Sequence, residues 1–329
     1  MKSKSFDTKK FLSQNGIWGV LIVMVILLTI VRPVFISRMN LQTLLESESI
    51  KGILAFGIMW AILSKGIDLG PGSVVALVSA VVASLVQQTG VTGRLLGENG
   101  LHLSAPLAML VGLLIGAVVG LITGVIIAYT QIPPFIATLG TQLICRALAK
   151  MYTDRPVSNL EDSFRWIAKG KIGPVPMIVV VFIIMYILTA FLLTQTRFGK
   201  NVYAIGGNSQ AARFAGINVE KNLVMVYIIC SVCAALGGIL LAARTGSADP
   251  SSNGLMYETD AIAAATVGGT SHSGGICRVS GVLCGILILG VINNGLVLLG
   301  VDDNMTNVVR GAIIVGAVIL DMRKNVKKA

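Results

Sequence analysis

One uncharged stretch constrains this chain more than any other feature of its sequence. Residues 99–145 are 47 consecutive positions without an Asp, Glu, Lys or Arg. A bilayer core of about 30 Å is crossed by a helix of roughly 20 apolar residues, so the stretch is long enough for two crossings. It also contains its own helix breaker, Pro133–Pro134. Further uncharged runs cover 11–31, 69–93, 172–196, 222–243 and 279–301. The pattern predicts a polytopic membrane protein.

The composition agrees with this prediction. Of all residues, 54% are hydrophobic and 12% are charged, and the mean hydropathy is +0.83. Glycine, at 37 of 329 residues, is as frequent as expected where bilayer helices pack closely. The longest polar segment, 153–171, is too short for a soluble domain and is expected to be a loop. We therefore expect a single transmembrane domain over 1–329.

The distribution of basic residues gives an orientation. Predicted spans lie at 11–31, 50–64, 72–92, 105–129, 134–152, 175–195, 223–243, 258–270, 279–300 and 305–321. With the N-terminus inside, the inner segments hold 14 Lys and Arg residues and the outer ones eight, Lys51 among the latter. Because an excess of Lys and Arg marks the cytoplasmic side, both termini (1–10 and 322–329) are expected there. The net charge of +11 is then explained by topology and not by nucleic-acid binding.

The longest cytoplasmic connection, 196–222, contains a predicted short helix. Asn208 or Ser209 would cap its start, and Gly216 would end it. Its apolar side chains are unusual for a solvated loop, so we expect a docking element for another protein. A helix lying against the membrane surface is the alternative. The candidate docking residues are Gly206, Gly207, Asn208, Ala211, Ala212, Phe214 and Gly216.

Two glycine-rich breaks interrupt the predicted spans. The first, Lys65–Ser73, has three glycines around Pro71 and carries Asp68. It fits either a cytoplasmic turn with Asp68 near a helix start or a gate element, since irregular backbone at membrane depth must be buried or line a cavity. The second follows 260–270, which is too short for a full crossing. It is expected either to continue into flanking residues or to pair with a broken helix.

Polar residues within spans are functional candidates by default. Gln142, Arg146 and Lys150 recur every four residues and share a helix face. Asn293 and Asn294 point about 100° apart on a helix, so at most one should face a pathway. Interhelical hydrogen bonding is an equal alternative for them. The candidate pathway residues are Asp68, Phe135, Thr138, Gln142, Asp260, Asn293 and Asn294.

The sequence predicts no catalytic or metal site. It contains no phosphate-binding G-x-x-x-x-G-K-[ST] motif. His272 lacks a second ligand at metal-binding spacing, and Cys230 and Cys233 lie in an uncharged helix without the context of a redox motif. All five cysteines are interpreted as small apolar residues, without disulfides. No paired carboxylates or nucleophile–base set supports an intramembrane enzyme.

Several motifs together resemble the ribose/galactose-type monosaccharide permeases of bacterial ABC importers, over roughly 40–321. The similar segments are Lys65-Gly-Ile-Asp-Leu-Gly-Pro-Gly-Ser73, Pro134-Phe-Ile-Ala-Thr-Leu-Gly140, Thr196-Arg-Phe-Gly-Lys-Asn201, Ala204-Ile-Gly-Gly-Asn208, Gly216-Ile-Asn218, Tyr257-Glu-Thr-Asp-Ala-Ile-Ala-Ala264, Gly268-Gly-Thr-Ser271 and Asn293-Asn-Gly-Leu296. Two departures stand out. Gly70-Pro71 replaces Ser-Val, and Ser209-Gln210 replaces an acidic residue followed by alanine.

This resemblance implies an all-α permease in the bacterial cytoplasmic (inner) membrane, with about ten transmembrane helices, broken helices and an inverted repeat. It implies a homodimer, or a pair with a related permease. The implied partners are a cytoplasmic ABC ATPase, which holds ATP and Mg, and a periplasmic or lipid-anchored sugar-binding protein. The chain itself would bind no cofactor. The 208–216 helix matches the position of the family's coupling helix, in a coupling loop at 196–222.

Two other functions remain open from the sequence. One is an ABC permease for a non-sugar cargo such as branched-chain amino acids. The other is an ion-coupled secondary transporter, for which Asp260, Arg244 and Arg310 are the candidate ionisable groups.

Overall fold

The computed structural model describes residues 8–97 and 100–326, and these are almost entirely helical. The helices are α1 (Thr8–Val31), the 3-10 helix η1 (Pro33–Ile36), α2 (Arg38–Leu63), α3 (Pro71–Leu85), α4 (Ala105–Thr130), α5 (Pro134–Tyr152), α6 (Asp162–Lys169), α7 (Met177–Gln195), α8 (Arg197–Gly207), α9 (Ser209–Phe214), α10 (Val219–Thr245), α11 (Tyr257–Val267), α12 (Val279–Leu298) and α13 (Asp303–Val326). The strands β1 (Val157–Ser158) and β4 (Ser247–Ala248) pair antiparallel, as do β2 (Lys171–Ile172) and β3 (Val175–Pro176). The all-α prediction is confirmed.

Local sequence signals set several helix ends. The first turns of α3, α4 and α5 contain Pro71, Pro106 and Pro134. There the missing N–H is not needed and the fixed φ already suits a helix. Gly246 follows α10 with a φ of +74°, the left-handed conformation that commonly ends a helix. These boundaries follow from residue type alone.

Four helices, α4, α7, α10 and α12, are long and apolar enough to cross a membrane by length and composition. Shorter apolar helices cover 16–31, 71–85 and 304–319. The outward faces of α4 and α7 carry exposed leucine, isoleucine and valine side chains, such as Leu114 and Ile187. Soluble monomers rarely expose continuous apolar faces of this kind, whereas lipid tails solvate them. These faces support the membrane prediction.

Some predicted boundaries were wrong. The span predicted at 50–64 is the end of the much longer α2, so Lys51 lies inside a helix and not in an outer loop. The span predicted at 72–92 ends as α3 at Leu85. The predicted loop 153–171 contains α6 and β1. The first error arose because charged residues were taken to mark a loop, whereas Glu46 and Lys51 of α2 are paired inside the bundle.

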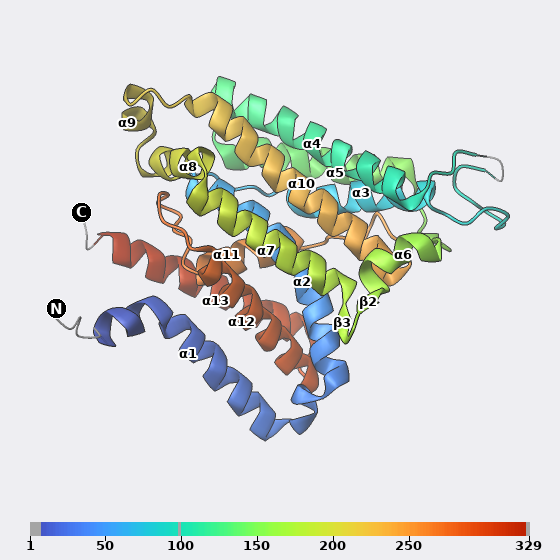
Figure 1. Ribbon diagram of the computed structural model, residues 1–329, viewed down its shortest axis with the longest axis horizontal. Coiled ribbons are helices and arrows are strands. Elements are labelled where there is room, and N and C mark those ends of the chain that lie inside the picture. Colours follow the sequence, from blue (N-terminus) through green and yellow to red (C-terminus); the bar gives the residue numbers. More distant parts are fainter. Residues whose placement is uncertain (1–7, 98–99, 327–329) are drawn as a thin grey trace.

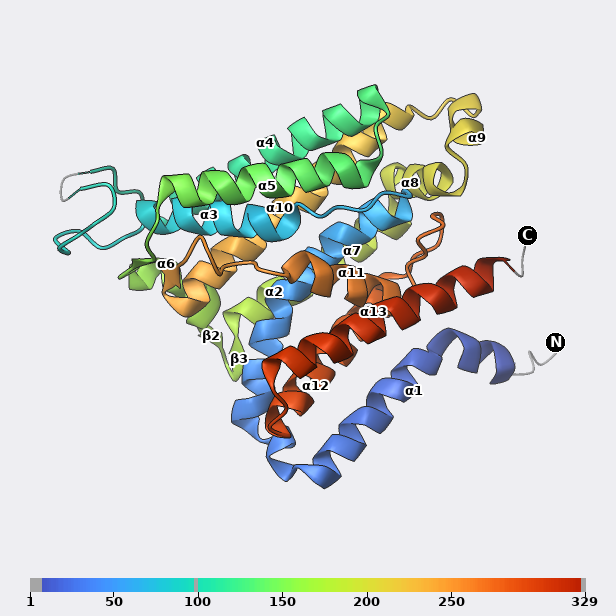
Figure 2. The same ribbon diagram turned by 180° about the vertical axis from the view of Figure 1, so that it is seen from behind.

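The helices surround a centre formed by α2, α3, α10 and α11 (Figure 1). α10 packs along α4, α2 and α3, while α2 also contacts α7, α11 and α12. The helix α13 packs against α11 and α12, and α1 packs against α12. Both views place α9, the start of α1 and the end of α13 at one end of the molecule, with α6 at the other (Figure 1, Figure 2).

Close packing of α4 on α10 depends on glycine. Gly116, Gly120 and Gly124 recur every four residues on the α4 face that meets α10. A Cβ at Gly120 would lie 2.5 Å from the carbonyl oxygen of Tyr227 and 2.7 Å from the Cα of Ile228. Small residues at this spacing let two helix backbones approach each other. The stripe therefore sets the α4–α10 distance.

We expect Gly120→Val to lower the free energy of unfolding by about 1–3 kcal/mol, because the new side chain would overpack this interface. The midpoint temperature of the detergent-purified protein measures the effect. The matched control is Gly140→Val in α5, where a Cβ would meet no atom within 4 Å. Equal losses in both variants would mean that helix propensity, and not interhelical packing, causes the effect.

Candidate functional site

The helix predicted in the 196–222 loop is present as α9. The Asn208 side chain caps it, its Oδ1 accepting the Ala211 backbone N–H at 3.0 Å. Gly216 follows the helix with a φ of +81°. Among its apolar residues, Ala212 is buried and Phe214 is 91% exposed. The predicted cap and end are thus confirmed, and a large apolar side chain projects from this end of the molecule.

The α8–α9 corner is joined to the bundle by a glycine junction, formed by Gly206, Gly274 and Gly275 around Leu63 at the end of α2. The Gly275 backbone N–H donates to the Leu63 carbonyl at 3.0 Å. A Cβ at Gly206 would lie only 1.8 Å from that same carbonyl oxygen. The three segments therefore meet backbone to backbone.

Two side chains reinforce this junction. The Lys65 Nζ donates to the Gly207 carbonyl at 3.2 Å. The Tyr203 hydroxyl of α8 donates to the Cys277 carbonyl at 2.6 Å. Burial raises the pKa of Tyr203 to about 12, so this hydroxyl stays neutral and available as a donor. Both bonds tie α8 to the segments that follow α2 and α11.

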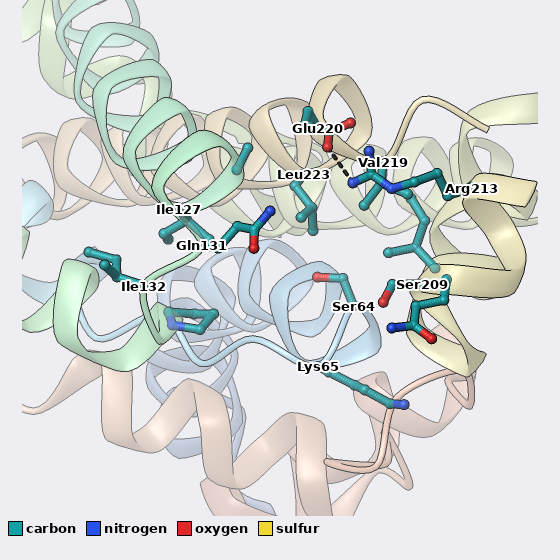
Figure 3. A pocket seen from close by; sticks show the side chains of 14 residues that line it. Ser64, Lys65, Ile127, Gln131, Ile132, Ser209, Arg213, Val219, Glu220 and Leu223 are labelled. Atoms are coloured by element: carbon teal, nitrogen blue, oxygen red, sulfur yellow. Dashed lines mark hydrogen bonds and ion pairs between the residues drawn. The ribbon is translucent and has the colours of Figure 1, made fainter. Parts of the chain in front are cut away.

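A cavity of about 480 Å³ opens beside the junction, between the ends of α2, α4 and α8–α9 and the start of α10 (Figure 3). An ion pair between Arg213 and Glu220 links α9 to α10 at its edge. Its lining is mixed: Ser64, Lys65, Ile127, Ala128, Gln131, Ile132, Pro134, Ile205, Ser209, Gln210, Arg213, Val219, Glu220 and Leu223. The hollow therefore lies where α9 meets the ends of α2 and α4 and the start of α10.

The short helices α3 and α11 meet at their N-terminal ends. A Cβ at Gly72 would lie 1.9 Å from the Glu258 Oε2, so glycine is needed for this approach. Glu258 is 6% exposed, and its Oε1 accepts from the Gln142 Nε2 at 3.2 Å. Within the described part of the chain its Oε2 has no hydrogen-bond partner. A carboxylate between two helix N-termini is favoured by both helix dipoles.

Arg146 closes this junction from α5. Its guanidinium donates to the carbonyls of Pro250 at 3.1 Å, Asn253 at 2.8 Å and Gly72 at 3.3 Å. Arg146 is therefore bound to backbone between α3 and the segment before α11. Gln142 and Arg146 do share a face, as predicted.

Asp68 holds the break between α2 and α3. It is buried, and its Oδ1 accepts the Gly70 backbone N–H at 2.9 Å. The Thr138 hydroxyl of α5 donates to the Ile67 carbonyl at 3.1 Å. These contacts match the prediction of a turn with Asp68 near a helix start. Phe135 is not part of this group, because its side chain is half exposed on the outer face of α5.

A buried charge network, Glu48, Lys51, Asp260 and Arg310, joins α2, α11 and α13. The Lys51 Nζ lies 2.8 Å from the Asp260 Oδ2 and 3.9 Å from the Glu48 Oε1. The Arg310 Nε lies 3.1 Å from the Asp260 Oδ1. Two acids and two bases make the network neutral, which is the condition for burying charges at tolerable cost.

The adjacent asparagines of α12 have different partners. Asn293 accepts from the Arg310 Nη2 at 3.3 Å and lines a small cavity with Glu48, Lys51 and Asp260. The Asn294 and Asn40 side chains donate to each other, each at 2.9 Å. The structure thus brings Asp260 and Asn293 together and places Asn294 in an interhelical bond. Sequence reasoning missed Glu48, Lys51 and Glu258 as site residues.

Comparison with known proteins identifies the family. The model of the family described as "Branched-chain amino acid transport system / permease component" matches residues 40–318. The galactose/methyl galactoside import permease protein MglC of Escherichia coli (strain K12) is 40% identical over 337 aligned positions, which cover 100% of this chain and 99% of that protein. The MglC protein of Haemophilus influenzae is 38% identical, with 99% and 98% covered. The ribose import permease protein RbsC of Bacillus subtilis (strain 168) is 41% identical, with 93% and 91% covered.

No solved structure matches the chain. The extent of the family match agrees with the 40–321 range over which the motifs resemble a permease. The chain therefore belongs to the family of permease components of branched-chain amino acid transport systems.

Proposed function

We propose that this chain is the membrane-spanning permease subunit of an ABC importer that carries a monosaccharide, such as galactose or ribose, into a bacterial cell. The observation that carries the proposal is similarity over nearly the whole chain to import permeases for galactose/methyl galactoside and ribose, at 38–41% identity. The chain is not an enzyme and binds no cofactor. ATP and Mg belong to a partner ATPase.

Transport proceeds by alternating access between two related halves, α2–α5 and α10–α13. In this scheme α2, α3, α4 and α5 are equivalent to α10, α11, α12 and α13. Each packing contact then has a counterpart after the halves are exchanged: α3–α5 corresponds to α11–α13, α4–α10 to α12–α2, and α2–α11 to α10–α3. Such correspondence supports an inverted repeat, the architecture of many transporters. The short helices α3 and α11 are equivalent in this scheme and account for the broken helices of an approximately ten-span permease.

The end of the molecule that carries α9 faces the cytoplasm. Support comes from the charge distribution and from the start of α1 and the end of α13, which lie at that same end (Figure 2). The ATPase docks on α9, where Phe214 is exposed, and its closure reaches α2 through the glycine junction. A periplasmic or lipid-anchored sugar-binding protein docks at the opposite end, and a second copy or a related permease completes the channel.

The pathway passes the junction of α3 and α11. Broken helices that meet near the bilayer centre commonly form transport sites, and Gln142 and Asp68 stand on one side of this junction. Asp260 and Asn293 stand on the other, toward α13. Amide and carboxylate groups can exchange hydrogen bonds with the hydroxyls of any monosaccharide, so we expect the binding protein to set selectivity.

The test is purification of the tagged chain from its native membranes in mild detergent, followed by uptake assays in vesicles. We expect a stoichiometric ATPase and galactose or ribose uptake that requires ATP hydrolysis. Uptake that stops with a protonophore while ATP stays high would instead indicate an ion-coupled carrier. The buried Asp260–Arg310 pair is the observation that favours this second candidate, because such carriers need buried ionisable groups. Competition by leucine but not by sugars would indicate the amino-acid cargo of the family description.

We expect Gly207→Trp to reduce ATP-dependent uptake at least about tenfold. A reduction of this size corresponds to the loss of a typical coupling free energy between two sites. A Cβ at Gly207 meets no atom within 4 Å, so the chain itself should accumulate normally and only ATPase docking should suffer. Gly140→Trp, also in open space but far from α9, is the matched control. Normal uptake by Gly207→Trp would remove α8–α9 from the coupling role.

A further inference from the structure

The helix α13 is attached to the bundle along a narrow face. Thr306 and Arg310 lie one turn apart on this face, followed by the partly buried Ile313 and Ile314. The opposite face, with Met305, Val308 and Val315, is more than half exposed. Figure 2 shows α13 running along the outside of α11 and α12. With so little buried apolar area, the described part of α13 depends strongly on the inward charged contact of Arg310.

The carboxylate that Arg310 contacts, Asp260, is paired with two cations. Arg310 approaches the Oδ1 of Asp260, and Lys51 approaches the Oδ2 from α2. If α13 moves away, Asp260 keeps Lys51, and Arg310 leaves toward water together with its helix. Breaking a buried ion pair is costly mainly when one charge is left buried without a partner. Because Lys51 stays paired with Asp260, the free-energy cost of separating Arg310 is small enough for the separation to be reversible.

Lys51 can itself adjust. It sits between Asp260 and Glu48, with a short contact to the first and a long one, 3.9 Å, to the second. Withdrawal of Arg310 would let Lys51 settle between the two acids, while water entering behind α13 solvates them. The network can therefore take two arrangements: one in which both Lys51 and Arg310 pair with Asp260, and one in which Lys51 alone does. Two discrete arrangements are what a two-state element requires.

We propose that Arg310 and Asp260 form a latch that holds α13 against α11, and that α13 is released and recaptured during each transport cycle while Lys51 keeps Asp260 compensated. This inference rests on the proposed function, because the cycle is that of the ABC importer. Arg310 acts here as a positioning residue: it sets where α13 stands and does not contact the cargo.

The test measures the exposure of the α13 inner face in the assembled complex. Thr306 is 6% exposed, so Thr306→Cys should react slowly with a water-soluble maleimide while α13 is latched. Adding Arg310→Gln should raise the reaction rate about tenfold, the change expected from loss of ~1.4 kcal/mol of latch free energy. Arg310→Lys, which keeps the charge, should stay within about threefold of the latched rate.

The matched control is Arg244→Gln. Arg244 is also a partly buried arginine paired with a carboxylate, Glu46, at 3.5 Å, but it belongs to α10. We expect it to leave the labelling rate within about twofold, because Arg244 pairs with Glu46 of α2 and not with Asp260. Equal labelling in Arg310→Gln and Arg244→Gln would overturn the latch.

A second measurement ties the latch to the cycle. Trapping the complex with ATP and vanadate should speed labelling at Thr306→Cys in the otherwise unaltered chain and add little in Arg310→Gln. No effect of nucleotide on a complex that transports sugar would overturn the proposal. The labelling reaction needs no cargo, so the Arg310 variants test the latch even if no ATPase copurifies with the chain. Absence of a copurifying ATPase would count against the importer function and not against the latch.

Discussion

Asp260→Asn should nearly eliminate the folded permease from membranes. The substitution removes one negative charge and leaves Lys51 and Arg310, whose side chains are 16% and 18% exposed, with Glu48 as their single acid. Removing one partner of a buried ion pair costs about 3–5 kcal/mol, because the other charge stays buried without compensation. We expect a midpoint temperature lowered on the order of 10 °C in detergent. Size-exclusion chromatography after heating measures this.

Asp162→Asn is the control for this variant. Asp162 also pairs with an arginine, Arg165 at 3.4 Å, but its side chain is 91% exposed. Exposed pairs of this kind contribute about 0–1 kcal/mol, so the control should unfold close to the original temperature.

A double variant separates charge balance from the loss of a particular hydrogen bond. Asp260→Asn combined with Lys51→Met leaves Glu48 and Arg310, which again sum to zero. We expect this protein to be more stable than Asp260→Asn alone, although it has lost more polar contacts. A double variant less stable than the single one would show that geometry, and not net charge, governs the network.

The short helix α9 could be predicted from the sequence because its signals are local. Asn208 caps α9 through a bond to a residue three positions away, and Gly216 ends it by its own φ. Both depend on residue type and spacing within one short helix. The start of α3 at Pro71 and the end of α11 before Gly268 likewise follow from the residue types at those positions.

The charge network could not be predicted in the same way. Lys51 follows two glutamates, Glu46 and Glu48, in a polar stretch that is typical of a loop. Its principal partner, Asp260, lies more than 200 positions further along the chain, and no spacing rule connects the two. The one local signal was the three-residue separation of Glu48 and Lys51, which places them on one helix face. Arg310 and Asp260 were noted as ionisable groups, but they were expected near span ends.

The glycine junction joins α8 directly to the bundle. At Gly206 three backbone segments, from α8, from the end of α2 and from the connection between α11 and α12, approach without intervening side chains. Backbone contacts of this kind resist compression far more than flexible side chains do. In the proposed function, a displacement of α8 would therefore reach a helix of one half and a connection of the other half at the same point.

Gly206→Val should accordingly be the most damaging single glycine replacement in the coupling loop. A Cβ there would lie 1.8 Å from the Leu63 carbonyl oxygen and 2.6 Å from the Gly275 nitrogen, and neither backbone atom can move alone. We expect a loss of at least about 3 kcal/mol, at the upper end of overpacking effects, with low abundance in membranes and disrupted bonding of Gly275 to Leu63. Gly207→Val, the same change one residue later in open space, should leave abundance and midpoint temperature nearly unaltered. If both variants accumulate normally and only uptake falls in each, the junction is a docking surface and not the rigid joint that links α8 to α2.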